Sequence, residues 1–164
     1  MKPIIGHPEF LQKLDNWLFK NTQEDAKWIA SKKSVGIPPL FRQYNDWLYR
    51  GMFVDAGFLL DLEKGKVKLN TYTSWTKDER IAIKFAKDKT ASGGMARGNV
   101  AIVLKKKIGT MDQVFDIDGF CLYMGADQLV MLGMDDLSVD SAIKEKEVLI
   151  ESGLQINKTD VKYL

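Results

Sequence analysis

The sequence of 164 residues has very few of the residues on which metal sites and many catalytic sites depend. Cys121 is the only cysteine and His7 is the only histidine. One cysteine cannot form an intrachain disulfide, which excludes a disulfide-stapled secreted scaffold. Zinc sites need several Cys or His ligands, and a catalytic triad needs a histidine in a structured position, whereas His7 lies near the N-terminus. We therefore expect no metal, and any enzyme chemistry has to come from carboxylates, hydroxyls and arginines.

Phosphate-loop, dinucleotide and membrane signatures are missing as well. The glycine-containing run 93–98 fits neither the G-x-x-x-x-G-K-S/T spacing nor the G-x-G-x-x-G spacing. No apolar run is long enough to cross a bilayer, and the apolar stretch at residues 3–5 is too short for a signal peptide. The net charge of +2 lacks the basic excess of a dedicated nucleic-acid binder. These features predict a cytoplasmic protein without a membrane partner, and we expect a monomer.

The length and the apolar fraction of 45% suit a single globular domain. Apolar residues at helical spacing predict helices over 8–18, 25–33 and 39–48. Short apolar or alternating stretches predict strands farther along, at 48–52, 67–73, 100–104, 147–150 and 154–156. A tight turn is expected between the last two strands, and a separate helix is expected at 78–87. Residues 88–99 contain three glycines and predict a mobile loop. Helices before strands indicate an α+β fold, with a helical part at 1–47 and a sheet core at 48–164.

The first candidate motif is Tyr49-Arg50-Gly51, an arginine at the end of a strand-like segment followed by glycine. An arginine fork can hold a diphosphate through paired hydrogen bonds, and glycine allows a ligand to approach the backbone. The alternative interpretation is a surface arginine before a turn.

The second motif runs from Tyr72 to Thr76 and comes directly before the helix at 78–87. Ser74 and Thr76 are candidates for hydrogen bonding at the end of a strand. The alternative interpretation for Thr76 is a helix cap, with Glu79 completing a capping box. That alternative does not account for Ser74.

The third motif is the pair Glu145 and Glu147 before a hydrophobic strand. Residues i and i+2 of a strand point to the same face, and two close carboxylates raise the pKa of one of them. The alternative interpretation is a solvated strand end, where alternating Lys and Glu are common.

In this order the three motifs resemble the arginine–serine–glutamate class of mono-ADP-ribosyltransferases, which includes clostridial binary-toxin catalytic domains and phage enzymes. The family pattern is aromatic-Arg-Gly, then aromatic-x-Ser-x-Ser/Thr before a helix ending in Phe-Ala, then Glu-x-Glu-hydrophobic. This chain has Tyr49-Arg50-Gly51, Tyr72-Thr73-Ser74-Trp75-Thr76 with Phe85-Ala86, and Glu145-Lys146-Glu147-Val148. The resemblance covers about residue 48 to the C-terminus. The chain departs from the pattern at Trp75, in a long segment at 110–138, and in a loop at 138–144 without an aromatic residue.

The resemblance implies a fold in which N-terminal helices precede two packed, largely antiparallel sheets around a cleft for NAD, which is the substrate. It implies that Glu147 stabilises the transition state, that Glu145 holds and deprotonates the acceptor arginine, and that Ser74 orients Glu147. The implied NAD-binding residues are Tyr49, Arg50 at the diphosphate, Gly51 at the nicotinamide, Thr76, Phe85 as core beneath the pocket, and Arg97 at a phosphate, with the loop 88–99 closing over NAD.

The implied activity is transfer of ADP-ribose from NAD to an arginine of a target protein, in the cytoplasm of a producing or phage-infected cell, with toxin-like chemistry. Three alternatives stay open. The same NAD chemistry can use nucleic acid or water as the acceptor. The chain can be an inactive NAD-binding or interaction module of this fold, or an unrelated α+β domain with chance matches.

Overall fold

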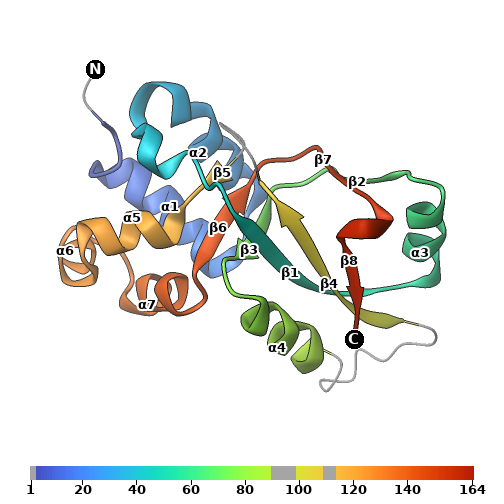
Figure 1. Cartoon of the computed structure of the whole chain (residues 1–164). Coiled ribbons are helices and arrows are strands. Elements are labelled where there is room, and N and C mark those ends of the chain that lie inside the picture. Colours follow the sequence, from blue (N-terminus) through green and yellow to red (C-terminus); the bar gives the residue numbers. More distant parts are fainter. Residues whose placement is uncertain (1–2, 90–98, 109–113) are drawn as a thin grey trace.

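The computed structural model describes residues 3–89, 99–108 and 114–164. These ranges contain seven α-helices, none of them long and apolar enough to cross a membrane. Two antiparallel sheets accompany the helices, so the chain combines α and β structure as expected. In spatial order the six-stranded sheet consists of β5 (Val114–Phe115), β6 (Glu147–Ile150), β3 (Thr73–Thr76), β1 (Trp47–Val54), β4 (Val100–Lys107) and β8 (Val161–Tyr163) (Figure 1). The two-stranded sheet pairs β2 (Val67–Leu69) with β7 (Leu154–Ile156).

The first two predicted helices are confirmed, and both are longer than predicted. They are α1 (Pro8–Lys20), which begins with proline in its first turn, and α2 (Gln23–Gly36). The third predicted helix, at 39–48, is wrong. Only a 3₁₀ turn, η1 (Pro39–Phe41), forms there, and the chain enters β1 at Trp47. Pairing of all of β1 with β4, from Trp47 opposite Lys107 to Val54 opposite Val100, outweighs the local helical spacing.

The helix α4 (Glu79–Lys89) lies on β1 and confirms the helix predicted at 78–87. A Cβ at Gly51 would lie 2.1 Å from the carbonyl oxygen of Ala82 and 2.9 Å from the amide nitrogen of Ala86. Glycine is therefore what allows α4 to approach β1 this closely. Asp88 belongs to the helix and not to the predicted loop, whose residues 90–98 lie outside the described residues.

The segment 110–138 is the largest departure from the predicted order of helices and strands. The chain here forms α5 (Ile117–Met124), α6 (Ala126–Met131) and α7 (Asp136–Lys144), and another helix, α3 (Ala56–Glu63), follows β1. The part expected as a sheet core thus returns to helical structure, and α7 occupies the whole of the loop predicted at 138–144. Buried side chains of α1, α2, α5, α6 and α7 share one apolar cluster, and these helices gather at the end of the sheet that carries β5 and β6 (Figure 1).

The strands β6 and β7 do not form the expected hairpin. β6 pairs with β3 and β5, whereas β7 crosses to the small sheet and pairs with β2. The predicted strand at 67–73 is likewise divided, because β2 ends at Leu69 and β3 begins at Thr73. A second apolar cluster contains buried residues from both sheets, including Trp75, Ile102, Val148 and Ile156. The two sheets therefore share a core.

Candidate active site

The cleft begins where β1 and β3 meet. These strands pair at one register position, Tyr49 opposite Thr76, whereas β1 pairs with β4 along its whole length. Beside that position lies a cleft of about 620 Å³, with walls from α1, the start of α2, β1, β3, α4, the end of α7 and the start of β6. This volume falls in the range typical of small-molecule sites.

Eight of the nine predicted site residues line this cleft: Tyr49, Arg50, Gly51, Ser74, Thr76, Phe85, Glu145 and Glu147. The ninth, Arg97, lies outside the described residues. The three motifs are far apart in sequence, and the order of the central strands, β6-β3-β1, brings them side by side. Glu147 is opposite Thr76 in the β3–β6 register, and Thr76 is opposite Tyr49.

Glu147 is the most deeply buried carboxylate of the cleft, with 5% of its surface exposed. Its Oε1 accepts a hydrogen bond of 2.8 Å from Oγ of Ser74 and one of 3.1 Å from Nε1 of Trp17. Burial raises the pKa of Glu147 to about 7, and the charge of Glu145 acts in the same direction, while Ser74, Trp17 and Arg50 lower it. Glu147 is therefore poised between its charged and neutral forms near neutral pH. The hydrogen bond from Ser74 is the contact through which the resemblance expects Ser74 to orient Glu147.

Glu145 and Glu147 do not share a strand, which corrects the prediction from their spacing. Glu145 is exposed and follows the last residue of α7, and Lys146 has a φ of 50°, in the left-handed region. Of the two carboxylates, only that of Glu147 lies on β6. Both carboxylates nevertheless line the cleft, because the turn at Lys146 joins a helix end to a strand start within two residues. The outcome is one buried and one exposed carboxylate in the same site.

Arg50 retains unused hydrogen-bonding capacity. Its Nη1 donates to the backbone carbonyl of Ser74 at 2.6 Å, and its Nε is buried without a hydrogen-bond partner in the described part of the chain. Burial lowers the pKa of the guanidinium, and the charge of Glu147 opposes that effect. Buried polar groups are nearly always paired in native proteins. Arg50 as a residue lines the cleft, and a guanidinium there suits an anionic ligand such as a diphosphate.

Thr76 is not the helix cap that its sequence context suggests. It ends β3, and its Oγ1 accepts from the amide of Asp78 at 3.1 Å. Asp78 precedes the first residue of α4 and accepts from the amide of Arg80, so Asp78 caps the helix. Glu79 pairs with Lys162 of β8 at 3.0 Å. The Thr76 hydroxyl therefore fixes the bend between strand and helix, beside the cleft.

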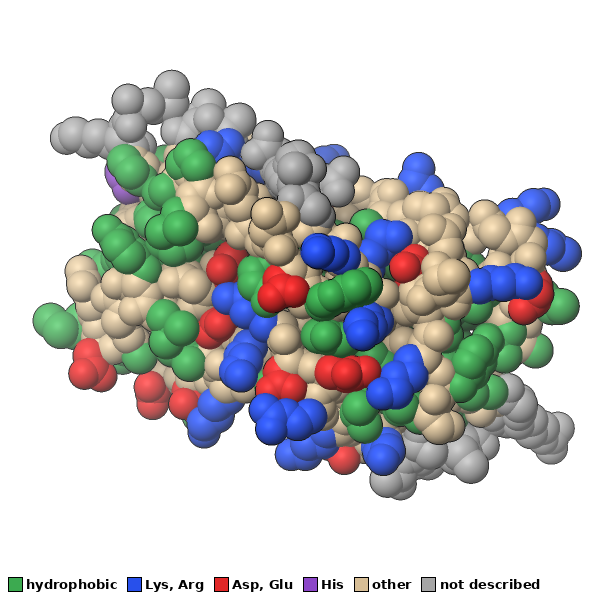
Figure 2. Space-filling model, viewed as in Figure 1, with side chains coloured by type: hydrophobic (Ala, Val, Ile, Leu, Met, Phe, Trp, Pro, Cys, Tyr) green, Lys and Arg blue, Asp and Glu red, His purple; other side chains and the backbone are tan. Residues whose placement is uncertain are grey.

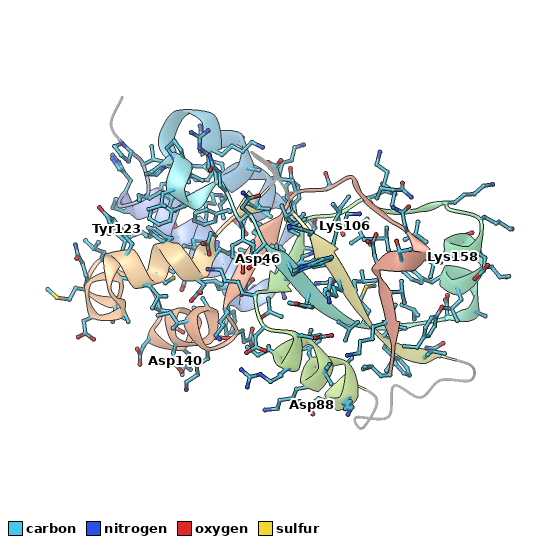
Figure 3. All side chains as sticks on the ribbon, viewed as in Figure 1. Asp46, Asp88, Lys106, Tyr123, Asp140 and Lys158 are labelled. Carbon is cyan, nitrogen blue, oxygen red and sulfur yellow. The ribbon has the colours of Figure 1, made fainter. Side chains whose placement is uncertain are left out.

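Phe85 is a wall of the cleft and not part of the core beneath it. Half of its surface, 50%, is exposed. The helix α4 meets β1 through Ala82 and Ala86, which are both buried, and Phe85 lies beside that contact. Asp88, farther along α4, also lines the cleft, and so does Lys144 at the end of α7, which pairs with Asp140 at 2.8 Å. Asp88 and Asp140 are labelled on α4 and α7 in Figure 3.

Sequence reasoning missed the contribution of the N-terminal helices. Trp17 and Leu18 of α1 line the cleft, together with Asn21 and Gln23. The helical spacing of its apolar neighbours assigns Trp17 to the core, and that assignment is correct as far as burial goes. One signal was available, since a buried tryptophan usually finds a partner for its N–H. The sequence does not reveal which residue that partner is.

Among the described residues, no group of three or more His, Cys, Asp or Glu side chains is placed to hold a metal ion. Comparison with protein-family models, with curated proteins and with solved structures finds no match, so the function of the cleft has to be inferred from its own residues.

Proposed function

We propose that this chain is a mono-ADP-ribosyltransferase that cleaves NAD and transfers ADP-ribose to an arginine side chain of a target protein. The observation that carries the proposal is the meeting of Arg50, Ser74, Glu145 and Glu147 in one cleft. Their chain order matches the arginine–serine–glutamate pattern, and the bond between Ser74 and Glu147 is the one that this pattern requires. The two antiparallel sheets with a common core support the proposed fold.

In the proposed mechanism, Arg50 binds the diphosphate of NAD with the donors that its bond to Ser74 leaves unused. Glu147 accepts a hydrogen bond from the 2′-hydroxyl of the nicotinamide ribose. Its negative charge stabilises the positive charge that develops as the C1′–nitrogen bond breaks and nicotinamide leaves with the electron pair. This role requires the ionised form, and a pKa of about 7 makes that form available at and above neutral pH.

Glu145 completes the transfer in this proposal. It is exposed at the cleft, where a side chain of another protein can reach it. Its carboxylate holds the acceptor guanidinium and takes a proton from it as the guanidinium nitrogen forms the new bond to C1′. Figure 2 shows Lys and Arg side chains interspersed with Asp and Glu on the visible face, a mixture that favours a protein acceptor over a nucleic acid.

The test is release of nicotinamide from NAD by wild type and by Glu147→Gln, with and without bacterial lysate, using NAD labelled in the adenine. We expect labelled protein in the lysate, removed by hydroxylamine as for an arginine linkage, and a loss of at least about a hundredfold in Glu147→Gln. The matched control is Glu63→Gln, the same exchange at an exposed residue of α3 outside the cleft.

Each other outcome has a definite meaning. Nicotinamide release without labelled protein would indicate water as the acceptor, and label on nucleic acid would indicate that class of target. Wild type that neither cleaves nor binds NAD would contradict the proposal and leave an interaction module.

A further inference from the structure

Trp17 is joined to the candidate active site by a hydrogen bond that none of the three motifs contains. It lies on α1 with 1% of its surface exposed, and its Nε1 donates to Oε1 of Glu147, 130 residues away along the chain. The indole is thus both part of the helical core and part of the cleft wall.

The two hydrogen bonds to Glu147 act on the same oxygen. Trp17 and Ser74 both donate to Oε1, and the described part of the chain supplies no hydrogen bond to Oε2. A carboxylate held at one oxygen by donors from two different elements, α1 and β3, loses its freedom to rotate. The other oxygen keeps its acceptor capacity for a ligand.

We propose that Trp17 is a positioning residue, which together with Ser74 holds Oε1 of Glu147 so that Oε2 is presented to a hydroxyl of the substrate. The identity of that hydroxyl, the 2′-hydroxyl of the nicotinamide ribose, rests on the proposed function. The positioning itself depends only on the contacts within the protein.

The surroundings of Trp17 fix the indole in place. Phe10 and Leu14, on the same helix, are fully buried, and α1 packs against both α2 and α7. Just after α1, the side chain of Gln23 forms two hydrogen bonds with the backbone of Tyr72, at 2.9 and 2.8 Å. These contacts tie the N-terminal helices to the segment that leads into β3, so both donors to Glu147 belong to one connected framework.

An indole suits this task for a chemical reason. The indole N–H is a donor only, so it cannot take a proton from Glu147. For the same reason it cannot accept the hydrogen bond that a substrate hydroxyl donates to Glu147. It is also neutral, so it orients the carboxylate without adding the charge of a second arginine beside Arg50. A donor to the charged form lowers the pKa of a carboxyl group. Removing the Trp17 donor therefore raises the pKa of Glu147 above about 7.

The other groups that act on Glu147 come from elements other than α1. Arg50 faces it from β1, Glu145 from the end of α7, Ser74 from β3 and Cys121 from α5. A change in the titration of Glu147 in a Trp17 variant is thus assigned to the lost donor, provided that a change in core packing alone has no such effect.

The experiment compares Trp17→Phe, which removes the N–H and keeps an aromatic ring, with Phe10→Leu. Phe10 lies two helical turns before Trp17 on α1 and is equally buried, so its variant loosens the same core without removing a donor. The pKa of Glu147 is measured without NAD by carbon-13 NMR of the glutamate carboxyl groups, with the Glu147 signal assigned from Glu147→Gln. We expect a rise of about one pH unit in Trp17→Phe and the wild-type value in Phe10→Leu.

A second readout is the pH profile of kcat/KM for NAD, whose acidic limb reports the ionisation of the free enzyme. A rise of about one pH unit lowers the ionised fraction of Glu147 at pH 7 by about fivefold, and the loss is recovered near pH 9. An unchanged Glu147 titration in Trp17→Phe, or an equal shift in Phe10→Leu, would overturn the proposal.

The experiment still gives an answer if the first variant does not fold or if the wild type has no activity. If Trp17→Phe does not fold, 3-benzothienylalanine at position 17 keeps the shape of the indole and replaces its N–H by sulfur, with the same expected shift. If wild type does not cleave NAD, the proposed function fails, while the NMR titration still decides the role of Trp17.

Discussion

Burial of Glu147 has a cost that can be measured as protein stability, independently of any activity. Its pKa rises from 4.5 to about 7 on folding, so the folded state holds the proton more tightly than the unfolded chain does. Between these two values the free energy of unfolding falls as the pH rises. At 1.36 kcal/mol for each pH unit, the loss reaches about 3 kcal/mol by pH 8. Below pH 4.5 both states are protonated and the full stability is present.

Glu147→Gln should remove this loss. Glutamine has the same shape, and its carbonyl oxygen can accept the bonds from Ser74 and Trp17. We therefore expect the variant to match wild type near pH 4 and to exceed it by up to about 3 kcal/mol at pH 8, which is about 6 to 12 °C in Tm for a chain of this size.

Urea unfolding of both proteins between pH 4 and pH 8 measures the effect. Glu63→Gln, at an exposed position, serves as the control and should follow the wild-type dependence on pH. A difference between Glu147→Gln and wild type that stays constant over the whole range would refute the reasoning. It would mean that Glu147 is solvated in solution.

Two further predictions concern packing. Gly51→Ala places a Cβ 2.1 Å from the carbonyl oxygen of Ala82, so α4 must move away from β1. We expect the free energy of unfolding, measured in urea, to fall by about 1–3 kcal/mol. A fall below about 0.5 kcal/mol would contradict the close contact between α4 and β1. Cys121 is fully buried, and burial, followed by the charges of nearby carboxylates, raises the pKa of its thiol to about 12. We therefore expect a disulfide reagent at pH 8 to label Cys121 only in denaturant. Rapid labelling of the native chain would show that α5 is open.

The sequence predicts those parts of the fold that have a strong local pattern. The stripe of α1, the helix α4 and the strands around Arg50 and Val148 are found near their predicted positions. The prediction fails where long-range contacts decide the outcome. Trp47 and Leu48 fit a helical spacing and still join β1, because β4 pairs with them. The helices α5 and α7 were missed although an aspartate caps each of them, at Asp116 and Asp135.

The residues of the candidate site come from short motifs whose order in the chain is informative, and the structure brings eight of them into one cleft. Spacing placed Glu145 and Glu147 on one strand, which is wrong. The resemblance placed both in one site, and both line the cleft. Trp17 could not have been predicted, because its link to Glu147 depends on how α1 packs against the sheet. The resemblance assigned Phe85 to the core beneath the pocket, whereas its position beside the contact between α4 and β1 leaves it exposed.

Buried charges elsewhere in the chain help to distinguish a structural group from a functional one. Lys77 forms ion pairs with Asp116 and Asp118 at 2.8 and 3.1 Å, and these bonds raise its pKa against the effect of burial. That cluster is satisfied within the protein, so it needs no ligand. Arg50 and Glu147 differ, because one keeps an unpaired buried N–H and the other an oxygen without a donor in the described part of the chain. Both residues line the same cleft, so a single bound ligand can donate to the free oxygen of Glu147 and lie beside the guanidinium of Arg50.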